Sequence, residues 1–290
     1  MCRLYGLQAT RPTHAACELL DAQNALIEQS REDTRGLSNP HGWGLGHIES
    51  GTTTCFRQVK PAAESAEYRE SALNTAGTTL LAHVRRATVG DPDHANTHPF
   101  RHGPALLIHN GHVPAFDAVR PRLLKGLDDD HRRAVRGTTD SEHIFALLLQ
   151  LRAERPDAPL QAITRQAVRR LQEWTREATP EAHVTPVEAD TTALSHDELE
   201  GILGLNLLWT DGEALGGSRL NRTLWALERQ EVPVCSVCGT RHANPPEEAD
   251  YRATVLASER ITDEDWTEVP NGSVFSAGPD ARLHAEPLDD

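Results

Sequence analysis

The pattern of apolar and polar positions predicts strands near both ends of the chain and helices between them. Short apolar or alternating runs bounded by turn residues are typical of strands. They occur at 2–9, 42–48, 52–59, 79–85, 105–109, 202–210, 222–228, 252–258 and 273–276. Helical periodicity marks residues 13–29, 63–74, 141–153 and 159–175. Strands followed by helices and then again by strands indicate an α+β fold built in layers.

Two polar stretches without periodicity, 177–199 and 229–250, interrupt this pattern. Structureless segments of this length within a compact domain are usually insertions or mobile loops. Nothing in the pattern requires a second folding unit. We therefore predict a single domain over residues 2–280 that carries two surface insertions, followed by a C-terminal tail at 281–290.

Composition and charge exclude several classes of protein. The 290 residues carry a formal net charge of −14, whereas a nucleic-acid-binding protein is expected to present a basic face. No run of about 20 apolar residues is present to span a bilayer, and residues 1–30 lack the apolar segment of a signal peptide. Five cysteines in so long a chain do not indicate a disulfide framework. We expect a cytoplasmic protein that binds neither nucleic acid nor membrane.

Cys2 is the first candidate for chemistry. Removal of Met1 would make it the N-terminal residue, with a thiol and a free α-amine on the same residue. An α-amine has an ordinary pKa near about 8, so it can act as a built-in general base for the thiol. On position alone, a buried cysteine in a first strand is the simpler interpretation, because free cysteines are often buried.

Three further segments offer the groups that such a nucleophile needs. Arg85 ends an apolar strand and can hold a carboxylate through two hydrogen bonds, or it can form a surface ion pair. Asn110 and the N–H of Gly111 can form an oxyanion hole, although Asn-Gly is also an ordinary turn. Asp140 can cap a helix or hold an ammonium group. With Cys2, these groups describe one ligand, an α-amino acid whose side chain ends in a carbonyl that is attacked.

These residues lie in segments that resemble the class II glutamine amidotransferases, a family with the N-terminal-nucleophile fold. The likeness is dense over residues 1–150 and looser over 200–280. The matching segments are Met1-Cys2-Arg3-Leu4, Asn39-Pro40-His41-Gly42-Trp43-Gly44, Ala82-His83-Val84-Arg85-Arg86-Ala87-Thr88, Asn96-Thr97-His98-Pro99-Phe100, His109-Asn110-Gly111, Thr139-Asp140-Ser141-Glu142, Ala257-Ser258-Glu259-Arg260 and Trp266-Thr267-Glu268-Val269-Pro270.

The resemblance implies a four-layer αββα sandwich and a reaction that passes through a γ-glutamyl thioester, which water then hydrolyses. No cofactor is required. The implied roles are nucleophile and base for Cys2, oxyanion stabilisation by Asn110 and Gly111, binding of the substrate α-carboxylate by Arg85 and of its α-amine by Asp140, and lining of the pocket by Thr88 and His98. The chain departs from the family at His41, where an acidic residue is usual.

The chain is most similar to small stand-alone members, which include ergothioneine-pathway γ-glutamyl hydrolases, because residues 151–290 are taken up by helices, loops and closing strands. Its small-molecule substrate is then glutamine, with ammonia passed to a separate synthase partner, or a γ-glutamyl conjugate. A non-catalytic binding or regulatory module with the same fold is the alternative. The complete set of implied site residues favours an enzyme.

Cys235 and Cys238 form a C-x-x-C pair, and His242 follows four residues later. Two thiolates at this spacing can chelate one metal ion, and His242 can supply a third ligand to a structural zinc. A closed site needs a fourth ligand, but the sequence has no second C-x-x-C. A free thiol pair in an insertion is therefore the other interpretation. Cys17 and Cys55 are expected in the core or in a hairpin.

Overall fold

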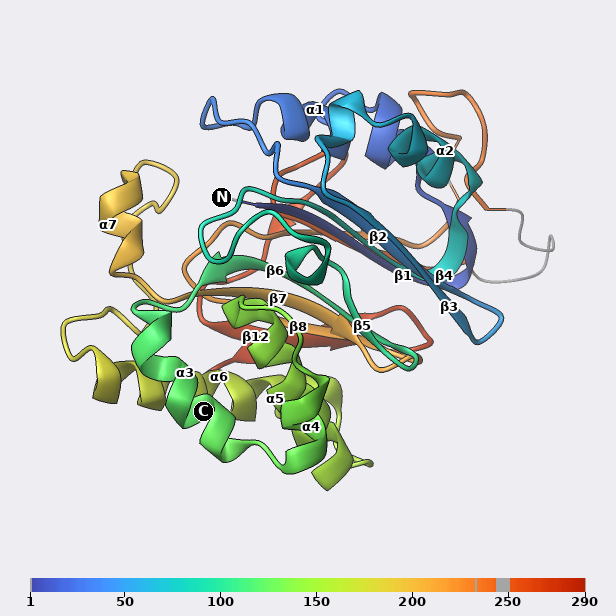
Figure 1. Cartoon of the computed structure of the whole chain (residues 1–290). Helices are drawn as coiled ribbons and strands as arrows, with labels where there is room; N and C mark the ends of the chain where they lie inside the picture. Colours follow the sequence, from blue (N-terminus) through green and yellow to red (C-terminus); the bar gives the residue numbers. More distant parts are fainter. Residues whose placement is uncertain (1, 233, 244–250, 290) are drawn as a thin grey trace.

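Two antiparallel sheets lie face to face between two layers of helices in the computed structural model (Figure 1), which describes residues 2–232, 234–243 and 251–289. The first sheet has the strand order β11 (Thr267–Glu268), β9 (Trp225–Arg229), β10 (Ala253–Ala257), β1 (Arg3–His14), β4 (Ala76–Val84), β2 (Trp43–Glu49) and β3 (Thr52–Gln58). The second has the order β13 (Leu283–Pro287), β12 (Ser273–Ala277), β8 (Leu215–Arg219), β7 (Gly204–Thr210), β6 (Ala105–His112) and β5 (Phe100–His102).

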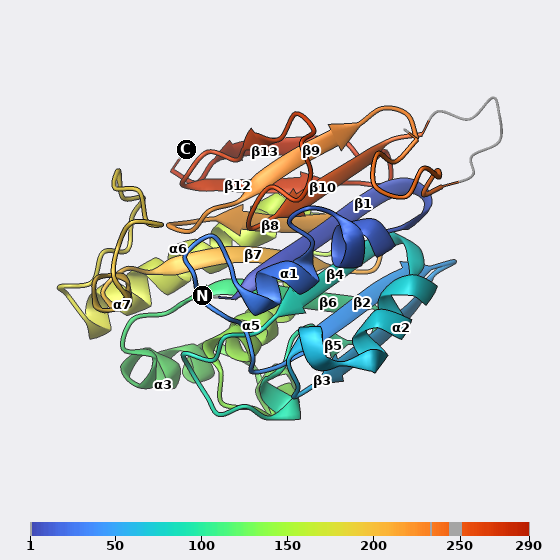
Figure 2. The same cartoon turned by 90° about the horizontal axis from the view of Figure 1, so that it is seen from above.

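Each sheet is covered on its outer face by its own helices (Figures 1 and 2). The first is covered by η1 (Cys17–Asp21), α1 (Leu26–Arg31), η2 (Ala62–Glu64) and α2 (Ala66–Asn74). The second is covered by α3 (Phe116–Gly126), α5 (Asp140–Glu154) and α6 (Leu160–Ala178), with α4 (Asp129–Ala134) packed on α5. The short helices η3 (His94–Asn96) and α7 (His196–Glu200) lie in connecting segments. This is the αββα arrangement that the resemblance implies.

Alternation along the strands produces the layered core, because successive side chains of a strand point to opposite faces. In β1, Tyr5 and Leu7 pack under the outer helices, while Leu4 packs between the two sheets. In β6, Leu107 packs toward α5 and α6, while Ile108 meets the first sheet. The two sheets are thereby held together by an apolar layer that runs up to the start of β1 and the end of β6.

Most of the predicted elements are confirmed, and the helix predicted at 141–153 is α5. Thr139 caps it by accepting a hydrogen bond from the Glu142 N–H. The single helix predicted at 13–29 is wrong, because β1 continues to His14 and only the short η1 and α1 follow. The Asn24 amide donates to Glu259 and to the Arg260 carbonyl oxygen. These contacts hold residues 22–25 out of helical conformation, which apolar spacing alone does not reveal.

Several elements were not predicted, namely η3, α3, α4, α7, β5, β8, β11 and β13. Strand β13 falls in the expected C-terminal tail at 281–290 and pairs with β12. Of the two expected insertions, 177–199 begins in the last two residues of α6, is irregular over 179–195 apart from an isolated bridge at His183, and ends within α7. The second, 229–250, includes residues 233 and 244–250, which lie outside the described residues. Among the helices described, none has both the length and the apolar character needed to cross a membrane.

Candidate active site

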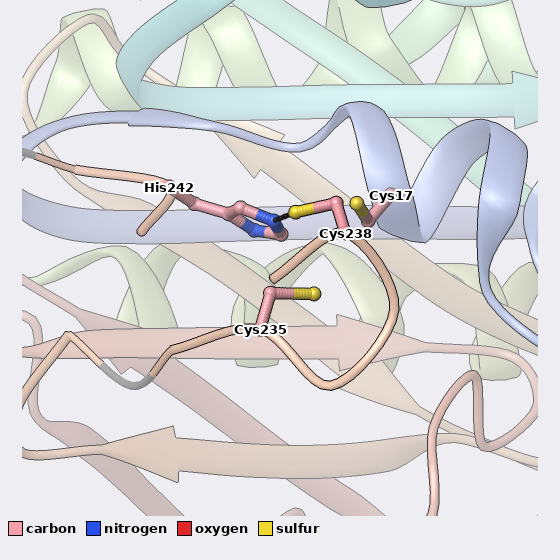
Figure 3. A group of neighbouring side chains, drawn as sticks. All are labelled: Cys17, Cys235, Cys238 and His242. Atoms are coloured by element: carbon pink, nitrogen blue, oxygen red, sulfur yellow. Dashed lines mark hydrogen bonds between the residues drawn. The ribbon is translucent and has the colours of Figure 1, made fainter. Parts of the chain in front are cut away.

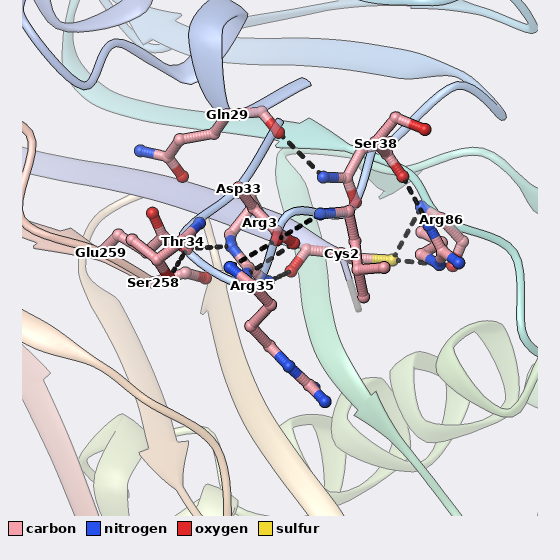
Figure 4. Close-up of polar contacts among 12 residues, drawn as sticks. Cys2, Arg3, Gln29, Asp33, Thr34, Arg35, Ser38, Arg86, Ser258 and Glu259 are labelled. Atoms are coloured by element: carbon pink, nitrogen blue, oxygen red, sulfur yellow. Dashed lines mark hydrogen bonds and ion pairs between the residues drawn. The ribbon is translucent and has the colours of Figure 1, made fainter. Parts of the chain in front are cut away.

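Cys2 lies immediately before β1, at the end of the chain marked N in Figure 1. Its side chain is half-buried, and its Sγ lies 3.4 Å from both the main-chain nitrogen and the main-chain oxygen of Arg86 (Figure 4). Arg86 follows β4, which is a direct neighbour of β1 in the sheet. Met1, whose removal the N-terminal-amine hypothesis requires, lies outside the described residues.

A buried ion-pair network fixes the residue that follows Cys2 (Figure 4). Arg3 Nη2 lies 2.7 Å from Asp33 Oδ2, and Arg3 Nε lies 2.7 Å from Glu259 Oε1. Arg3 Nη1 also donates to the Cys2 carbonyl oxygen at 3.0 Å. Removing one partner of a buried ion pair costs about 3–5 kcal/mol, so this network holds the main chain of Cys2 firmly. The sequence analysis assigned no role to these three side chains, although Arg3 and Glu259 stand in the matching segments.

Arg85 is buried at the end of β4, and its guanidinium donates to the carbonyl oxygens of residues 89–91 at 3.0–3.3 Å. The turn after the strand therefore wraps around this side chain. Burial lowers the pKa of Arg85, and the nearby negative charges of Cys2 and Asp140 oppose that shift. Arg85 thus lies within electrostatic reach of the thiol and of the carboxylate that the sequence analysis grouped with it.

His41, the position that departs from the family, supports the same turn. Its Nδ1 accepts a hydrogen bond from the Ala87 N–H at 2.9 Å, and the main-chain N–H of His41 donates to the Arg85 carbonyl oxygen at 3.0 Å. Burial and the charges of Arg85 and Arg86 lower the pKa of His41. The neutral imidazole that this favours is the form in which Nδ1 can accept.

Asn110 and Gly111 lie near the end of β6. Asn110 Nδ2 lies 3.3 Å from Ser258 Oγ, and the same hydroxyl accepts from the Leu4 N–H at 3.1 Å, two residues from Cys2. Gly111 has φ +151°, and a Cβ there would lie 2.0 Å from the Gly204 carbonyl oxygen. Only glycine fits that position. Ser258 therefore joins the start of β1 to the Asn110 amide, a link that the sequence analysis missed.

Asp140 opens α5, and its carboxylate is buried. Oδ2 accepts from the Val113 N–H at 2.9 Å, and Oδ1 accepts from the Ser141 N–H at 2.7 Å. His109 Nδ1 lies 2.9 Å from Ser141 Oγ, and His109 Nε2 lies 3.0 Å from the Gly204 carbonyl oxygen. A carbonyl can only accept, so Nε2 carries the proton and Nδ1 accepts from the hydroxyl. The start of α5 is thereby tied to the residue before Asn110.

His98 is buried beside these groups. Its ring centroid lies 4.2 Å from that of His83 and 4.7 Å from that of Phe100. His83 Nε2 donates to the His109 carbonyl oxygen at 3.1 Å. Burial lowers the pKa of His83 to about 3 and holds the pKa of His98 well below its usual range. These pKa shifts favour neutral imidazoles, and both rings are buried in the protein.

A cavity of about 500 Å³ adjoins this arrangement. Thr88, Thr138 and Arg120 contribute to its wall, together with residues 89–90 and Val113. Residues 89–90 accept hydrogen bonds from Arg85, and Val113 donates to Asp140. The volume is typical of a small-molecule site. Among the residues predicted to bind substrate, Thr88 lines the cavity, whereas the side chains of Arg85, Asp140 and His98 are buried.

The residues predicted to bind metal lie elsewhere. Cys235, Cys238 and His242 lie together with Cys17, just beyond the last residue of β1. A strand of this length spans about 40 Å. The cluster is therefore at the opposite end of β1 from Cys2, and it is separate from the candidate active site.

Comparison with known proteins agrees with this geometry. Residues 1–199 match the family model described as "Glutamine amidotransferases class-II". A curated relative, the "Probable glutamine amidotransferase DUG3" of Saccharomyces cerevisiae, is 26% identical over 309 residues, covering 95% of this chain and 81% of the relative. The "Gamma-glutamyl-hercynylcysteine sulfoxide hydrolase" of Mycolicibacterium smegmatis is 36% identical over 107 residues, covering 35% of this chain and 47% of that protein.

Solved structures share the fold. A "glutamine aminotransferase class-II domain protein" from Silicibacter pomeroyi superposes with a TM-score of 0.61 at 18% identity and covers 99% of both chains. A "predicted glutamine amidotransferase" from Pseudomonas aeruginosa gives a TM-score of 0.57 at 21% identity, over 98% of this chain and all of that one. The resemblance stated from the sequence is thus confirmed, and the chain is an enzyme that belongs to the class II glutamine amidotransferases.

Proposed function

We propose that this enzyme hydrolyses the amide bond of a γ-glutamyl compound through a thioester on Cys2. The observation that carries the proposal is the convergence of Cys2, Arg85 and Asn110 from the ends of three strands, β1, β4 and β6, beside one cavity. Ser258 bridges the first and third of these strand ends. The names of two relatives, a glutamine amidotransferase and a γ-glutamyl hydrolase, support the same class of substrate.

The proposed reaction begins after Met1 is removed. The free α-amine of Cys2 takes the thiol proton, and Sγ attacks the γ-carbonyl carbon of the substrate. The negative charge that develops on the carbonyl oxygen is stabilised by the Asn110 amide and the Gly111 N–H. The C–N bond breaks as the α-ammonium of Cys2 returns its proton to the leaving nitrogen. Water, deprotonated by the same amine, then hydrolyses the thioester and releases glutamate.

Binding of the glutamyl group is assigned to Arg85, Asp140 and Thr88. Among the described residues, Arg85 uses both N–H groups of Nη2 and one of Nη1 on the carbonyls of residues 89–91, which leaves the Nε–H and one Nη1–H, so a substrate carboxylate would accept from one of these or displace a carbonyl. The buried Asp140 carboxylate suits a substrate ammonium. We assign His98 a positioning role, because its ring packs on His83, which holds the carbonyl of the residue before Asn110.

Asn110 needs one adjustment to serve as an oxyanion donor. Its Nδ2 faces Ser258 Oγ, while its Oδ1 is buried and has no hydrogen-bond partner among the described residues. Rotation of the amide by about half a turn exchanges these atoms. The Ser258 hydroxyl then donates to Oδ1, and Nδ2 is released toward the substrate. Both arrangements use the same hydroxyl.

A γ-glutamyl conjugate is the substrate that the cavity favours over free glutamine. The cavity extends from Thr88 to Phe116 and Arg120 of α3, and this provides an aromatic and a cationic side chain for a leaving group larger than ammonia. Steady-state kinetics with γ-glutamyl dipeptides and with glutamine test this preference. A higher kcat/KM for the conjugates supports it. A preference for glutamine instead favours ammonia delivery to a separate partner.

Covalent labelling tests the nucleophile. Intact mass should show that Met1 has been lost, and a glutamine-mimicking diazoketone should add one label that peptide mapping assigns to Cys2. The Cys2→Ala variant should take no label, whereas Cys55→Ser, a matched control in β3, should label as the wild type does. A folded, processed protein that takes no label would instead indicate a non-catalytic binding module. Retained Met1 would exclude the amine as the base.

A further inference from the structure

The structure supplies the fourth member of the cysteine and histidine group that the sequence left incomplete. Cys17, the first residue of η1, lies beside Cys235, Cys238 and His242, and the four ligand atoms all lie within 4.8 Å of one another (Figure 3). Cys238 Sγ and His242 Nε2 are 3.4 Å apart. All three cysteines are free thiols. Three sulfurs and one imidazole nitrogen converge here from two distant segments of the chain.

The turn that carries Cys235 and Cys238 is built to present both thiols to one point. The Val237 N–H points to Cys235 Sγ at 3.4 Å, and the Gly239 N–H donates to the Cys235 carbonyl oxygen at 2.9 Å. Gly239 has φ +71°, a conformation that glycine adopts without strain. An N–H directed at sulfur stabilises a thiolate, because the negative charge rests on the acceptor.

A second layer of side chains orients the imidazole. His242 Nδ1 lies 3.5 Å from Glu18 Oε2, and Glu18 Oε1 accepts from Arg229 Nη1 at 2.9 Å. The Glu18 side chain is buried, with 3% of its surface exposed. If Nδ1 carries the ring proton and directs it toward this carboxylate, the Nε2 lone pair is free, and Nε2 is the atom that faces Cys238 Sγ. In zinc sites, a carboxylate commonly contacts the ring nitrogen of a ligating histidine that does not bind the metal.

We propose that Cys17, Cys235, Cys238 and His242 bind one zinc ion. Thiolates with an imidazole in a closed set of four are typical of tetrahedral structural zinc. Zinc–sulfur bonds of about 2.3 Å place tetrahedral sulfurs about 3.8 Å apart. The present separations, up to 4.8 Å, need only a small contraction. A disulfide would use two of the thiols and leave the third, the imidazole and the Glu18 contact unexplained.

The ion would join two parts of the first sheet. Cys17 follows the end of β1, and residues 235–242 lie in the connection between β9 and β10, which pairs with β1. Four protein ligands leave no open position for substrate or water, so the site is structural. Its place at the far end of β1 from Cys2 separates it from the proposed chemistry. The proposed zinc site and the proposed function can therefore be tested independently of each other.

Metal analysis of the full-length protein tests the site directly. We expect one zinc per chain after purification without chelator, and at most two thiols reactive in the native state. All five thiols should react after denaturation with a chelator. Cys17→Ser should lose most of the zinc and lower Tm by at least about 5 °C. Cys55→Ser should keep the zinc content and the Tm of the wild type. Equal zinc in Cys17→Ser and wild type, a bound metal other than zinc, or a Cys235–Cys238 disulfide in the purified protein would overturn the proposal.

Two further measurements apply even where Cys17→Ser fails to fold. Replacement of the ion by Co²⁺ in the wild-type protein should give the intense visible bands of tetrahedral cobalt and a thiolate charge-transfer band; octahedral spectra contradict the site. Glu18→Gln should weaken zinc binding about 10- to 100-fold while the stoichiometry at saturation stays at one. Glu264→Gln is the matched control, because Glu264 also pairs with Arg229 but accepts from Thr262 instead of contacting His242.

Discussion

The two ends of β1 carry cysteines whose surroundings differ completely. At the start, the single thiol of Cys2 is half-buried and faces the main chain of Arg86, and the turn that follows Arg86 contributes Thr88 to the wall of a cavity. Beyond the end, Cys17 is enclosed by two more thiols and an imidazole. A nucleophile needs one open side, whereas a structural metal ligand needs to be surrounded. Neighbouring side chains, rather than the strand that both cysteines flank, therefore distinguish the two proposed roles.

Replacing the cysteine at each end of β1 in a separate variant should give the largest effects. Cys2→Ala should lower kcat/KM by a factor on the order of 10⁴ or more, because the nucleophile is lost, while Tm should stay within about 2 °C. Cys17→Ser should do the reverse, with a lower Tm but diazoketone labelling retained below the unfolding temperature. Thermal melts and labelling stoichiometry, measured on both variants, check the prediction. Loss of labelling in a folded Cys17→Ser protein would show that the two ends are coupled.

Removal of Asn110, the proposed oxyanion donor, should give the next largest effect. Asn110→Ala should lower kcat by about 10²- to 10³-fold, because an amide that binds the developing negative charge is worth about 2.7–4 kcal/mol in the transition state. KM should change little, and the labelling site should remain Cys2. Burst kinetics would show slower formation of the thioester. An increase in KM at constant kcat would instead mean that Asn110 binds the ground state of the substrate.

Local sequence patterns predicted the elements whose structure depends mainly on residues close together in the chain. The strands and α5 follow apolar spacing, and Thr139 caps α5 as its residue type suggests. The helix predicted at 13–29 failed because the Asn24 amide bonds to Glu259 and the Arg260 carbonyl oxygen, which are far away in the sequence. Strand β13 was missed because it pairs as an edge strand, and no buried apolar face marks its sequence.

The same distinction between local patterns and contacts of residues far apart in the sequence applies to the candidate sites. Cys2, Arg85 and Asn110 stand in recognisable segments, so the sequence could predict them. The Arg3–Asp33–Glu259 network could not be predicted, because its members come together only when residues 33 and 259 fold against β1. Cys17 was expected in the core or in a hairpin, and it is buried. Its place beside Cys235 and Cys238 could not be predicted, because the sequence does not show where the loop that carries this pair packs.

Acid should weaken the active-site end through its buried histidines. The pKa of His83 is lowered to about 3 by burial, with His98, His109 and Arg85 as its charged or titratable neighbours, whereas in the unfolded chain it is about 6.5. The unfolded state therefore binds a proton that the native state does not bind, and the free energy of unfolding falls as pH falls below about 6.5. Between pH 7 and pH 5, wild type should lose about 2 kcal/mol more than His83→Gln in urea unfolding. Equal losses of stability in wild type and His83→Gln would show that His83 can take up a proton in the native state.

The smallest effect tests whether Ser258 acts through Asn110. Its hydroxyl accepts from the Leu4 N–H and meets the Asn110 amide, so Ser258→Ala should leave that amide less well oriented and lower kcat about 3- to 10-fold at constant KM. Ser218→Ala is the matched control, because Ser218 is an equally buried strand serine whose hydroxyl binds only the Leu205 carbonyl oxygen among the described contacts. The double variant Asn110→Ala/Ser258→Ala should be no slower than Asn110→Ala alone, since a positioning residue has no effect once the group it positions is absent. Multiplicative losses would instead mean that Ser258 stabilises the start of β1, and with it Cys2, independently of the oxyanion donor.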